Sequence, residues 1–171
     1  MTRRLLLALP LLLSACASPP SCDDRPYSGS ACREARLLQQ NDMLQAKLLI
    51  AAGDPEHYEL AGALLRRAAA GDRTGEVPFY QALLLIREGP QLDEVLALLE
   101  QAATRGHPHA MALLYKIYAE PYLVAEADPI RAQTYRVRYG ELDVAKSGYP
   151  SFEQALRVVD GLLASPPAET P

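Results

Sequence analysis

The sequence predicts an all-α fold, arranged as a short α-solenoid of antiparallel helical hairpins over residues 33–163. Three observations predict it. Apolar residues recur at helical spacing, in segments that glycine and proline separate. No alternation of apolar and polar residues is long enough to indicate a strand. Finally, two segments recur about one hairpin length further along the chain, which is typical of a repeat architecture.

The first 15 residues have the features of a secretory signal. Arg3 and Arg4 precede an apolar run, residues 5–13, which is too short to span a bilayer alone. The run ends in Leu13-Ser14-Ala15-Cys16, which resembles the lipobox of bacterial lipoproteins. The resemblance implies cleavage before Cys16 and lipidation of that cysteine. An ordinary cleaved signal with a coincidental cysteine is the alternative.

The same resemblance implies a location. No aspartate, the residue associated with inner-membrane retention, follows Cys16, because Ala17 and Ser18 stand there. We therefore expect an outer-membrane protein that is lipid-anchored and faces the periplasm. Removal of residues 1–15 would leave 15 of the 17 basic residues against 21 acidic ones. Such an acidic chain is a poor partner for nucleic acid, which selects basic surfaces.

Residues 16–32 are predicted to be the lipidated N-terminus and a tether, because they are rich in Pro, Ser, Gly and Asp and lack apolar periodicity. This segment holds Cys22 and Cys32, an even pair in a secreted context, for which a structural disulfide is the preferred interpretation. Closing so short a loop would stabilise the fold by about 2.5 to 3 kcal/mol. Two free thiols are the alternative, and a metal site is less favoured because no histidine lies nearby.

Capping residues and helix-breaking glycines mark the ends of the predicted helices. An apolar stripe, Leu37, Leu44, Leu48 and Ala51, precedes Gly53. Asp54-Pro55 and Asp128-Pro129 each combine an N-cap residue with proline at the first helical position. Residues 77–86 are apolar on almost every side, which predicts a helix between two neighbours. Another apolar stripe ends at Gly106. Residues 164–171 are expected to form a disordered tail.

The helices contain an internal repeat. Residues 64–69, Leu-Leu-Arg-Arg-Ala-Ala, recur at 98–103 as Leu-Leu-Glu-Gln-Ala-Ala. The helix that follows also recurs, since residues 78–84 match residues 108–114. A degenerate third copy runs from Arg131 to Gly148 and continues from Pro150 to Leu156. The unit is therefore a helical hairpin with a loop of variable length.

These hairpins resemble the Sel1-like and tetratricopeptide repeat families over residues 55–158. The Ala-Ala pairs before glycine, and Ala82 and Ala112 before Leu-Leu, carry the resemblance. Small alanines permit close helix packing. The Leu-Gly step and the glycine-rich loop of Sel1 repeats are missing, which leaves the subfamily open. A generic helical bundle is the alternative architecture.

No catalytic constellation is found, so the chain is predicted not to be an enzyme and to need no cofactor, metal or small-molecule substrate. His107 and His109 flank Pro108 and would give only two metal ligands. The preferred interpretation is a loop at a helix start, with His107 favouring the dipole of the preceding helix. His57 is expected at the surface of a first turn.

A group of tyrosines and arginines near the third repeat is the candidate partner-binding face. Arg131, Tyr135 and Tyr139 follow one another at one-turn intervals, and Arg138 lies beside them. Tyrosine and arginine are the residues that dominate binding hot spots. The competing interpretation is that these tyrosines pack between hairpins, as buried tyrosines in repeats commonly do.

Together these features predict a scaffold lipoprotein that binds another envelope protein through its helical repeats. Its expected task is to assist assembly or stability of a secretion, pilus or polysaccharide-export machine. An immunity or inhibitor lipoprotein that neutralises a toxic enzyme in the periplasm is the alternative, because Sel1-like lipoproteins include such proteins. The partners expected are thus envelope proteins and the membrane, through lipid on Cys16.

Overall fold

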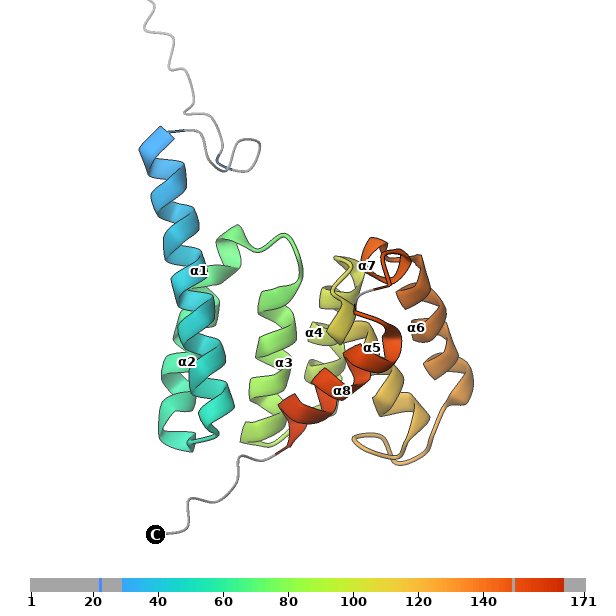
Figure 1. Cartoon of the computed structure of the whole chain (residues 1–171). Helices are drawn as coiled ribbons and strands as arrows, with labels where there is room; N and C mark the ends of the chain where they lie inside the picture. Colours follow the sequence, from blue (N-terminus) through green and yellow to red (C-terminus); the bar gives the residue numbers. More distant parts are fainter. Residues whose placement is uncertain (1–21, 23–28, 149, 165–171) are drawn as a thin grey trace, which may run out of the picture.

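A computed structural model describes residues 22, 29–148 and 150–164. Within these residues all regular structure is helical, which confirms the predicted fold class (Figure 1). The elements are α1 (Gly29–Ala52), η1 (Pro55–His57), α2 (Tyr58–Ala68), η2 (Ala69–Gly71), α3 (Glu76–Glu88), α4 (Leu92–Thr104), α5 (Pro108–Ala119), α6 (Pro129–Glu141), α7 (Asp143–Lys146) and α8 (Phe152–Leu163).

Successive helices from α1 to α6 lie side by side and alternate in direction, so that the chain forms a row of hairpins with α1 at one end and α6 at the other (Figure 1). The short α7 then leads into α8, which turns back and packs against α5 and α6. The guanidinium of Arg87, near the end of α3, donates to the carbonyl of Leu162 at 2.9 Å. The last helix is therefore bound to the middle of the row.

Several residues that match in the first two repeats are buried alike. Leu65 of α2 and Leu99 of α4 have no exposed surface, and the same holds for Ala82 of α3 and Ala112 of α5. In the third copy, Ala155 of α8 is equally buried. Small residues at these positions let neighbouring backbones approach closely.

The third copy differs from the other two in how its residues divide into helices. The segment from Arg131 to Gly148 was expected to match one helix, but the structure ends α6 at Glu141 and places the Ala145 region in the four-residue α7. Leu142, between them, has an extended backbone, with φ −67° and ψ 146°. This break accounts for the longer spacing of the third copy.

The predicted helix starts are confirmed. The carboxylate of Asp54 accepts a hydrogen bond from the backbone N–H of Glu56 at 3.0 Å, and that of Asp128 accepts one from Arg131 at 2.9 Å. Each cap satisfies an N–H group that has no partner within its own helix. After α4 the chain turns at Gly106, whose φ of +81° suits glycine.

Helix α1 differs from its prediction in two ways. It begins at Gly29, inside the segment assigned to the tether. Its apolar stripe also faces solvent, since Leu37, Leu44 and Leu48 are 65%, 58% and 61% exposed. The buried side consists of other residues: Cys32, Asp42, Met43, Ala46 and Ile50. Because α1 ends the row, its neighbours α2 and α3 cover only one of its sides.

The core has two apolar clusters that meet at α3. Val77 and Leu84 of this helix belong to the smaller cluster, with α1 and α2. Phe79, Ala82 and Leu83 belong to the larger one, with α4, α5, α6 and α8. The prediction that residues 77–86 lie between two neighbours is therefore confirmed.

Several predicted segments lie outside the described residues, namely the signal (residues 1–15), Cys16, most of the tether and residues 165–171. Among the described helices, none combines the length and apolarity needed to cross a membrane.

Candidate functional site

The structure places the two tyrosines of the predicted partner-binding face inside the molecule. Tyr139 is only 1% exposed, and its hydroxyl donates to the carbonyl oxygen of Pro150 at 2.6 Å. Its ring meets the ring of Phe152 edge-on, with 5.2 Å between centroids. Burial raises the pKa of Tyr139, so that its hydroxyl stays a donor. This tyrosine fixes the start of α8 against α6.

Tyr135 is 4% exposed and makes equivalent internal contacts. Its ring stacks on that of Tyr118 with a centroid distance of 5.9 Å, and its hydroxyl donates to the carboxylate of Glu100. Burial, followed by the hydrogen bond to Glu100, raises its pKa. This contact joins α6 to α4.

Both predicted arginines continue this network. The guanidinium of Arg131 lies 4.8 Å from the ring centroid of Tyr118 and donates to its hydroxyl at 3.0 Å. The guanidinium of Arg138 lies 5.6 Å from the ring centroid of Tyr135 and 3.6 Å from a Glu100 oxygen. The structure thus brings all four predicted residues together through internal packing. The tyrosine rings cannot reach a partner unless α6 separates from the core.

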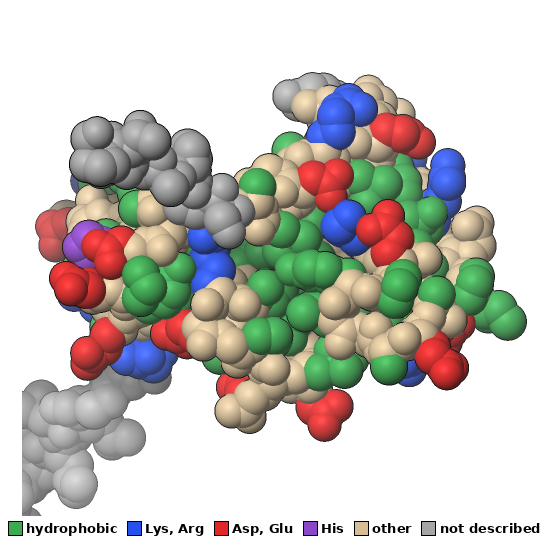
Figure 2. All heavy atoms as spheres, turned by 90° about the horizontal axis from the view of Figure 1, so that it is seen from below, with side chains coloured by type: hydrophobic (Ala, Val, Ile, Leu, Met, Phe, Trp, Pro, Cys, Tyr) green, Lys and Arg blue, Asp and Glu red, His purple; other side chains and the backbone are tan. Residues whose placement is uncertain are grey.

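A second set of residues on the same helix, which shares Arg138 with the first, faces solvent. We call it the α6 outer surface: Ile130, Gln133, Thr134, Val137 and Arg138. These residues line a shallow, open depression. Ile130 is 84% exposed and Val137, two turns later, is 54% exposed. The Thr134 hydroxyl donates to the Ile130 carbonyl at 3.1 Å, so it is already satisfied. Seen from below, the molecule has apolar side chains (green) spread across much of its surface (Figure 2).

Helix α6 is basic within an acidic chain. It carries Arg131, Arg136 and Arg138 but only one acid, Glu141, whereas the whole chain has a formal charge of −4. Arg136 lies 3.7 Å from Glu153, and both side chains are at least half exposed. Such exposed pairs are weak, so they leave the arginines able to exchange partners.

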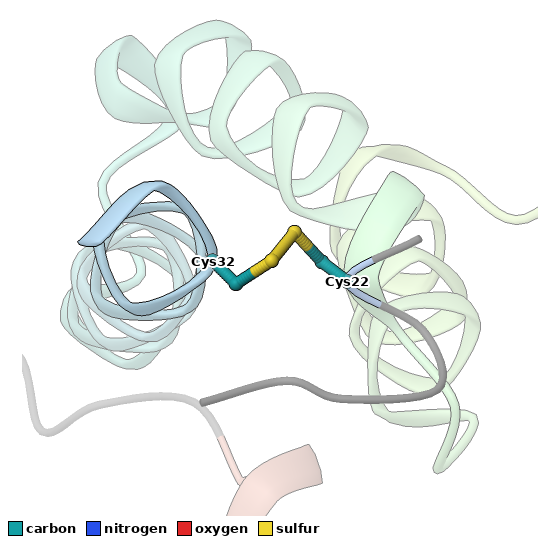
Figure 3. Close-up of a disulfide and its surroundings, with 2 residues drawn as sticks. All are labelled: Cys22 and Cys32. Atoms are coloured by element: carbon teal, nitrogen blue, oxygen red, sulfur yellow. A yellow bond between two sulfur atoms is a disulfide. The ribbon is translucent and has the colours of Figure 1, made fainter. Parts of the chain in front are cut away.

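The disulfide between Cys22 and Cys32 is present, with the Cα atoms 5.3 Å apart (Figure 3). It ties the segment before α1 to the first turn of that helix. A cleft of about 290 Å³ lies beside it, lined partly by Arg36, Asp42 and Arg67.

A buried carboxylate inside this cleft was missed in the sequence. Asp42 is fully buried, and both of its oxygens accept hydrogen bonds from the fork of Arg67, one of them from Nε at 2.6 Å. This contact lowers the pKa of Asp42. The pair joins α1 to α2 and is satisfied internally, which indicates a structural role. Its partners are 25 residues apart, so no local motif signals it.

His107 lies at the start of a helix, as expected, but its side chain acts on the helix that follows it. Its Nδ1 accepts a hydrogen bond from the backbone N–H of Ala110 at 3.3 Å, which makes it the N-cap of α5. Its ring is 8% exposed and stacks on Phe79 with 4.6 Å between centroids. Burial, together with the neighbouring His109, lowers its pKa to about 3. The expected interaction with the dipole of α4 needs a charged ring and is therefore wrong.

The remaining metal question concerns the whole described part of the chain. Within it, no group of three His, Cys, Asp or Glu side chains could hold a metal ion. His57 lies exposed in η1, 3.5 Å from a carboxylate oxygen of Asp54, as expected for a surface residue.

Comparison with known proteins assigns this chain to no family. No family model matches the chain, and no curated protein or solved structure matches it either. The resemblance to Sel1-like repeats and to a lipobox therefore stays a prediction. The α6 outer surface is the candidate site that contains Ile130, the most exposed large hydrophobic side chain among the described residues.

Proposed function

We propose that this chain is a lipid-anchored scaffold protein of the bacterial envelope, which acts by docking a partner on the α6 outer surface. Lipid on Cys16 would hold it at the outer membrane, facing the periplasm. The partner would belong to a secretion, pilus or polysaccharide-export machine. The observation that carries the proposal is the exposure of Ile130 and Val137 on one face of a helix whose other face is fixed in the core.

Single exposed apolar residues are ordinary on protein surfaces, so their arrangement is what matters here. Ile130 and Val137 are seven residues apart and share a helical face with Thr134, whose hydroxyl is already bonded. Full burial of a Val or Ile side chain contributes about 1.5 to 3 kcal/mol. The opposite side of α6 is held by Tyr135 and Tyr139, so little ordering would be needed on binding.

The surroundings of this surface define the chemistry of the partner. Arg131, Arg136 and Arg138 surround the apolar residues, with few acids on the same helix. An amphipathic segment with an apolar stripe and acidic flanks would complement this surface. The arginines would mainly speed association and make it sensitive to salt.

Partner binding is tested with a double variant, Ile130→Asp with Val137→Asp, in the full acylated chain. Both sites are exposed, so the fold should persist, and at position 130 aspartate suits the first turn of α6. The matched control is Leu60→Asp on α2, because Leu60 is 54% exposed, as Val137 is. A protein that cross-links to the wild type in membranes is then purified. The Kd of its complex with the wild type, the double variant and the control is measured by calorimetry.

We expect the Kd to rise at least tenfold for the double variant and to stay unchanged for the control. Equal affinity of the double variant and the wild type, with unchanged circular dichroism, would remove the α6 outer surface from the proposal. An equal loss in the control would instead indicate a nonspecific effect of added charge.

Anchoring is tested separately through Cys16→Ala. Cells grown with labelled palmitate should incorporate label into the wild type and not into this variant. The wild type should also sediment with outer-membrane fragments. Absence of label in the wild-type protein would refute the anchor and leave the binding surface to be judged on its own measurement.

A further inference from the structure

We propose that α1 pairs with α1 of a second copy to form a short, parallel, two-stranded coiled coil. The starting observation is that Leu37, Leu44 and Leu48 are each more than half exposed, and none belongs to either apolar cluster. Helix α1 lies at one edge of the molecule, with no described helix beyond it (Figure 1). Terminal repeats of a stack ordinarily carry a polar outer face, which this helix lacks.

The spacing of the exposed residues is that of a coiled-coil seam. Leu37, Leu44 and Ala51 are separated by seven residues each and occupy position d of a heptad. Asn41 and Leu48 then fall at position a, and all five are exposed. The seam is therefore continuous over two heptads.

The buried residues of α1 fall at other heptad positions. Cys32, Ala46 and the half-buried Gln39 occupy position f, and Met43 and Ile50 occupy position c. These positions lie on the side opposite to a and d. One face of α1 thus serves the monomer fold, and the other is left for a second helix. The two faces do not share residues, so pairing requires no rearrangement of the core.

Asn41 favours a second copy in parallel register as the occupant. A single asparagine at position a specifies register and a two-stranded state, because the two side-chain amides bond to each other only when they lie opposite. In a parallel pair Asn41 would face the partner's Asn41. In an antiparallel pair it would be buried opposite an apolar residue, which leaves its amide unsatisfied.

The charges beside the seam are compatible with self-association. Gln40 at position g would meet the partner's Gln45 at position e, and this contact carries no charge. Lys47, at the next g position, is paired with Glu76 of α3 and so is turned toward its own chain. Glu34, at the a position before the seam, would meet Glu34 of the second copy. The two like charges repel each other, so the contact between the helices ends there.

The pairing is expected to be weak in dilute solution, because two heptads form a small interface. Packing on α2 and α3 already holds the helix in shape, so little conformational entropy would be lost on pairing. If the proposed lipid anchor exists, both copies lead from the same membrane into the N-terminus of α1. The two helices then start on the same side, as in a parallel pair. Confinement to that surface would raise the effective concentration.

The test uses the full acylated chain in detergent micelles and in membranes. Asn41→Cys should form a disulfide-linked dimer on mild oxidation, because in-register a positions lie opposite each other. The matched control is Ile130→Cys on α6, which is 84% exposed but lies off the seam. Cross-linking at position 41 and not at position 130 supports the pairing. No cross-link at position 41 would overturn it.

A second measurement removes the seam without a new cysteine. Leu44→Glu with Leu48→Glu should halve the mass measured by sedimentation, with an unchanged helical signal because both sites are exposed. Asn41→Leu should tighten association at least tenfold and admit larger oligomers, which is a signature of position a. A mass that stays monomeric at a protein concentration of about 0.1 mM would overturn the proposal, because a weaker association would have no useful affinity.

Two further outcomes would also overturn it. Dimers that survive Leu44→Glu/Leu48→Glu but dissociate with Ile130→Asp/Val137→Asp would assign self-association to α6. Species that grow steadily with concentration would indicate head-to-tail stacking of α6 on α1. The α1 variants leave the α6 outer surface intact, so failure of the α1 pairing can be told apart from failure of envelope-partner binding.

Discussion

Helices α1 and α5 show that position in the row, more than apolar content, sets how much of a helix is buried. Helix α1 has 24 residues and buries five, one of them Asp42. Helix α5 has 12 residues and buries seven: Ala110, Met111, Ala112, Leu113, Leu114, Ile117 and Tyr118. Leucines thus have opposite environments in the two helices. The reason is that α4, α6 and α8 surround α5, whereas α2 and α3 cover one side of α1.

The largest effect is expected in α5, from Leu114→Ala. Leu114 has no exposed surface, and its removal would leave a cavity in the larger apolar cluster. Such a change destabilises a fold by about 2 to 5 kcal/mol. Urea denaturation followed by circular dichroism measures the free energy of unfolding. A loss below roughly 1 kcal/mol would show that neighbouring side chains refill the site.

The second effect concerns how α1 is held at the edge of the row. Replacing both Cys22 and Cys32 by serine opens the loop that precedes the helix. On the chain-entropy account this lowers the free energy of unfolding by about 2 to 3 kcal/mol. Urea denaturation of the wild type with and without reductant, next to the double variant, measures it. A response of the double variant to reductant would contradict the assignment.

A third effect of similar size is expected from pH, at the start of α5. The unfolded chain protonates His107 near its ordinary pKa of 6.5, while the folded chain does so only near pH 3. Stability from the neutral ring is therefore complete above pH 6.5 and is lost as the pH falls. Linkage gives a loss of about 2 kcal/mol between pH 7 and pH 5.

His107→Asn is the matched control, because asparagine also caps helices and does not titrate. The pH dependence of the variant should be flatter than that of the wild type, although its stability at pH 7 falls through loss of stacking on Phe79. Half-buried His109 also has a lowered pKa, through burial, and keeps part of the slope. Identical slopes in both proteins would show that His107 is solvated.

Features that depend on residues close together in the sequence, or on the repeat, could be predicted. Caps such as Asp54 and Asp128 were predictable because the carboxylate bonds to an N–H only two or three residues away. The repeat offsets correctly matched Leu65 with Leu99, since equal positions in a stack have equal neighbours. The disulfide was predictable from an even pair of cysteines in a secreted context.

Features that depend on which helix lies alongside were not predictable. The sequence shows the stripe of α1 but not that it faces solvent, because the number of neighbours is a tertiary property. Tyr135 and Tyr139 have the composition of a binding hot spot and yet lie in the core, as the interpretation that they pack between hairpins had it. Asp42 and Arg67 meet only because α1 and α2 pack together. The α6 outer surface shares Arg138 with the predicted residues, but its exposed apolar side chains, Ile130 and Val137, lie on the other side of the helix from the two buried tyrosines.

The smallest effect is expected from Leu44→Ala, which is the same substitution as Leu114→Ala made in the edge helix. Leu44 is 58% exposed and touches neither cluster, so its truncation should change the free energy of unfolding by no more than about 0.5 kcal/mol. Denaturation at low micromolar concentration keeps self-association from adding to the value. A loss equal to that of Leu114→Ala would mean that α1 has a cover on its outer side even in the monomer. If the loss instead appears only as protein concentration rises, the stability of α1 depends on a second copy, because binding to the folded state stabilises it by mass action.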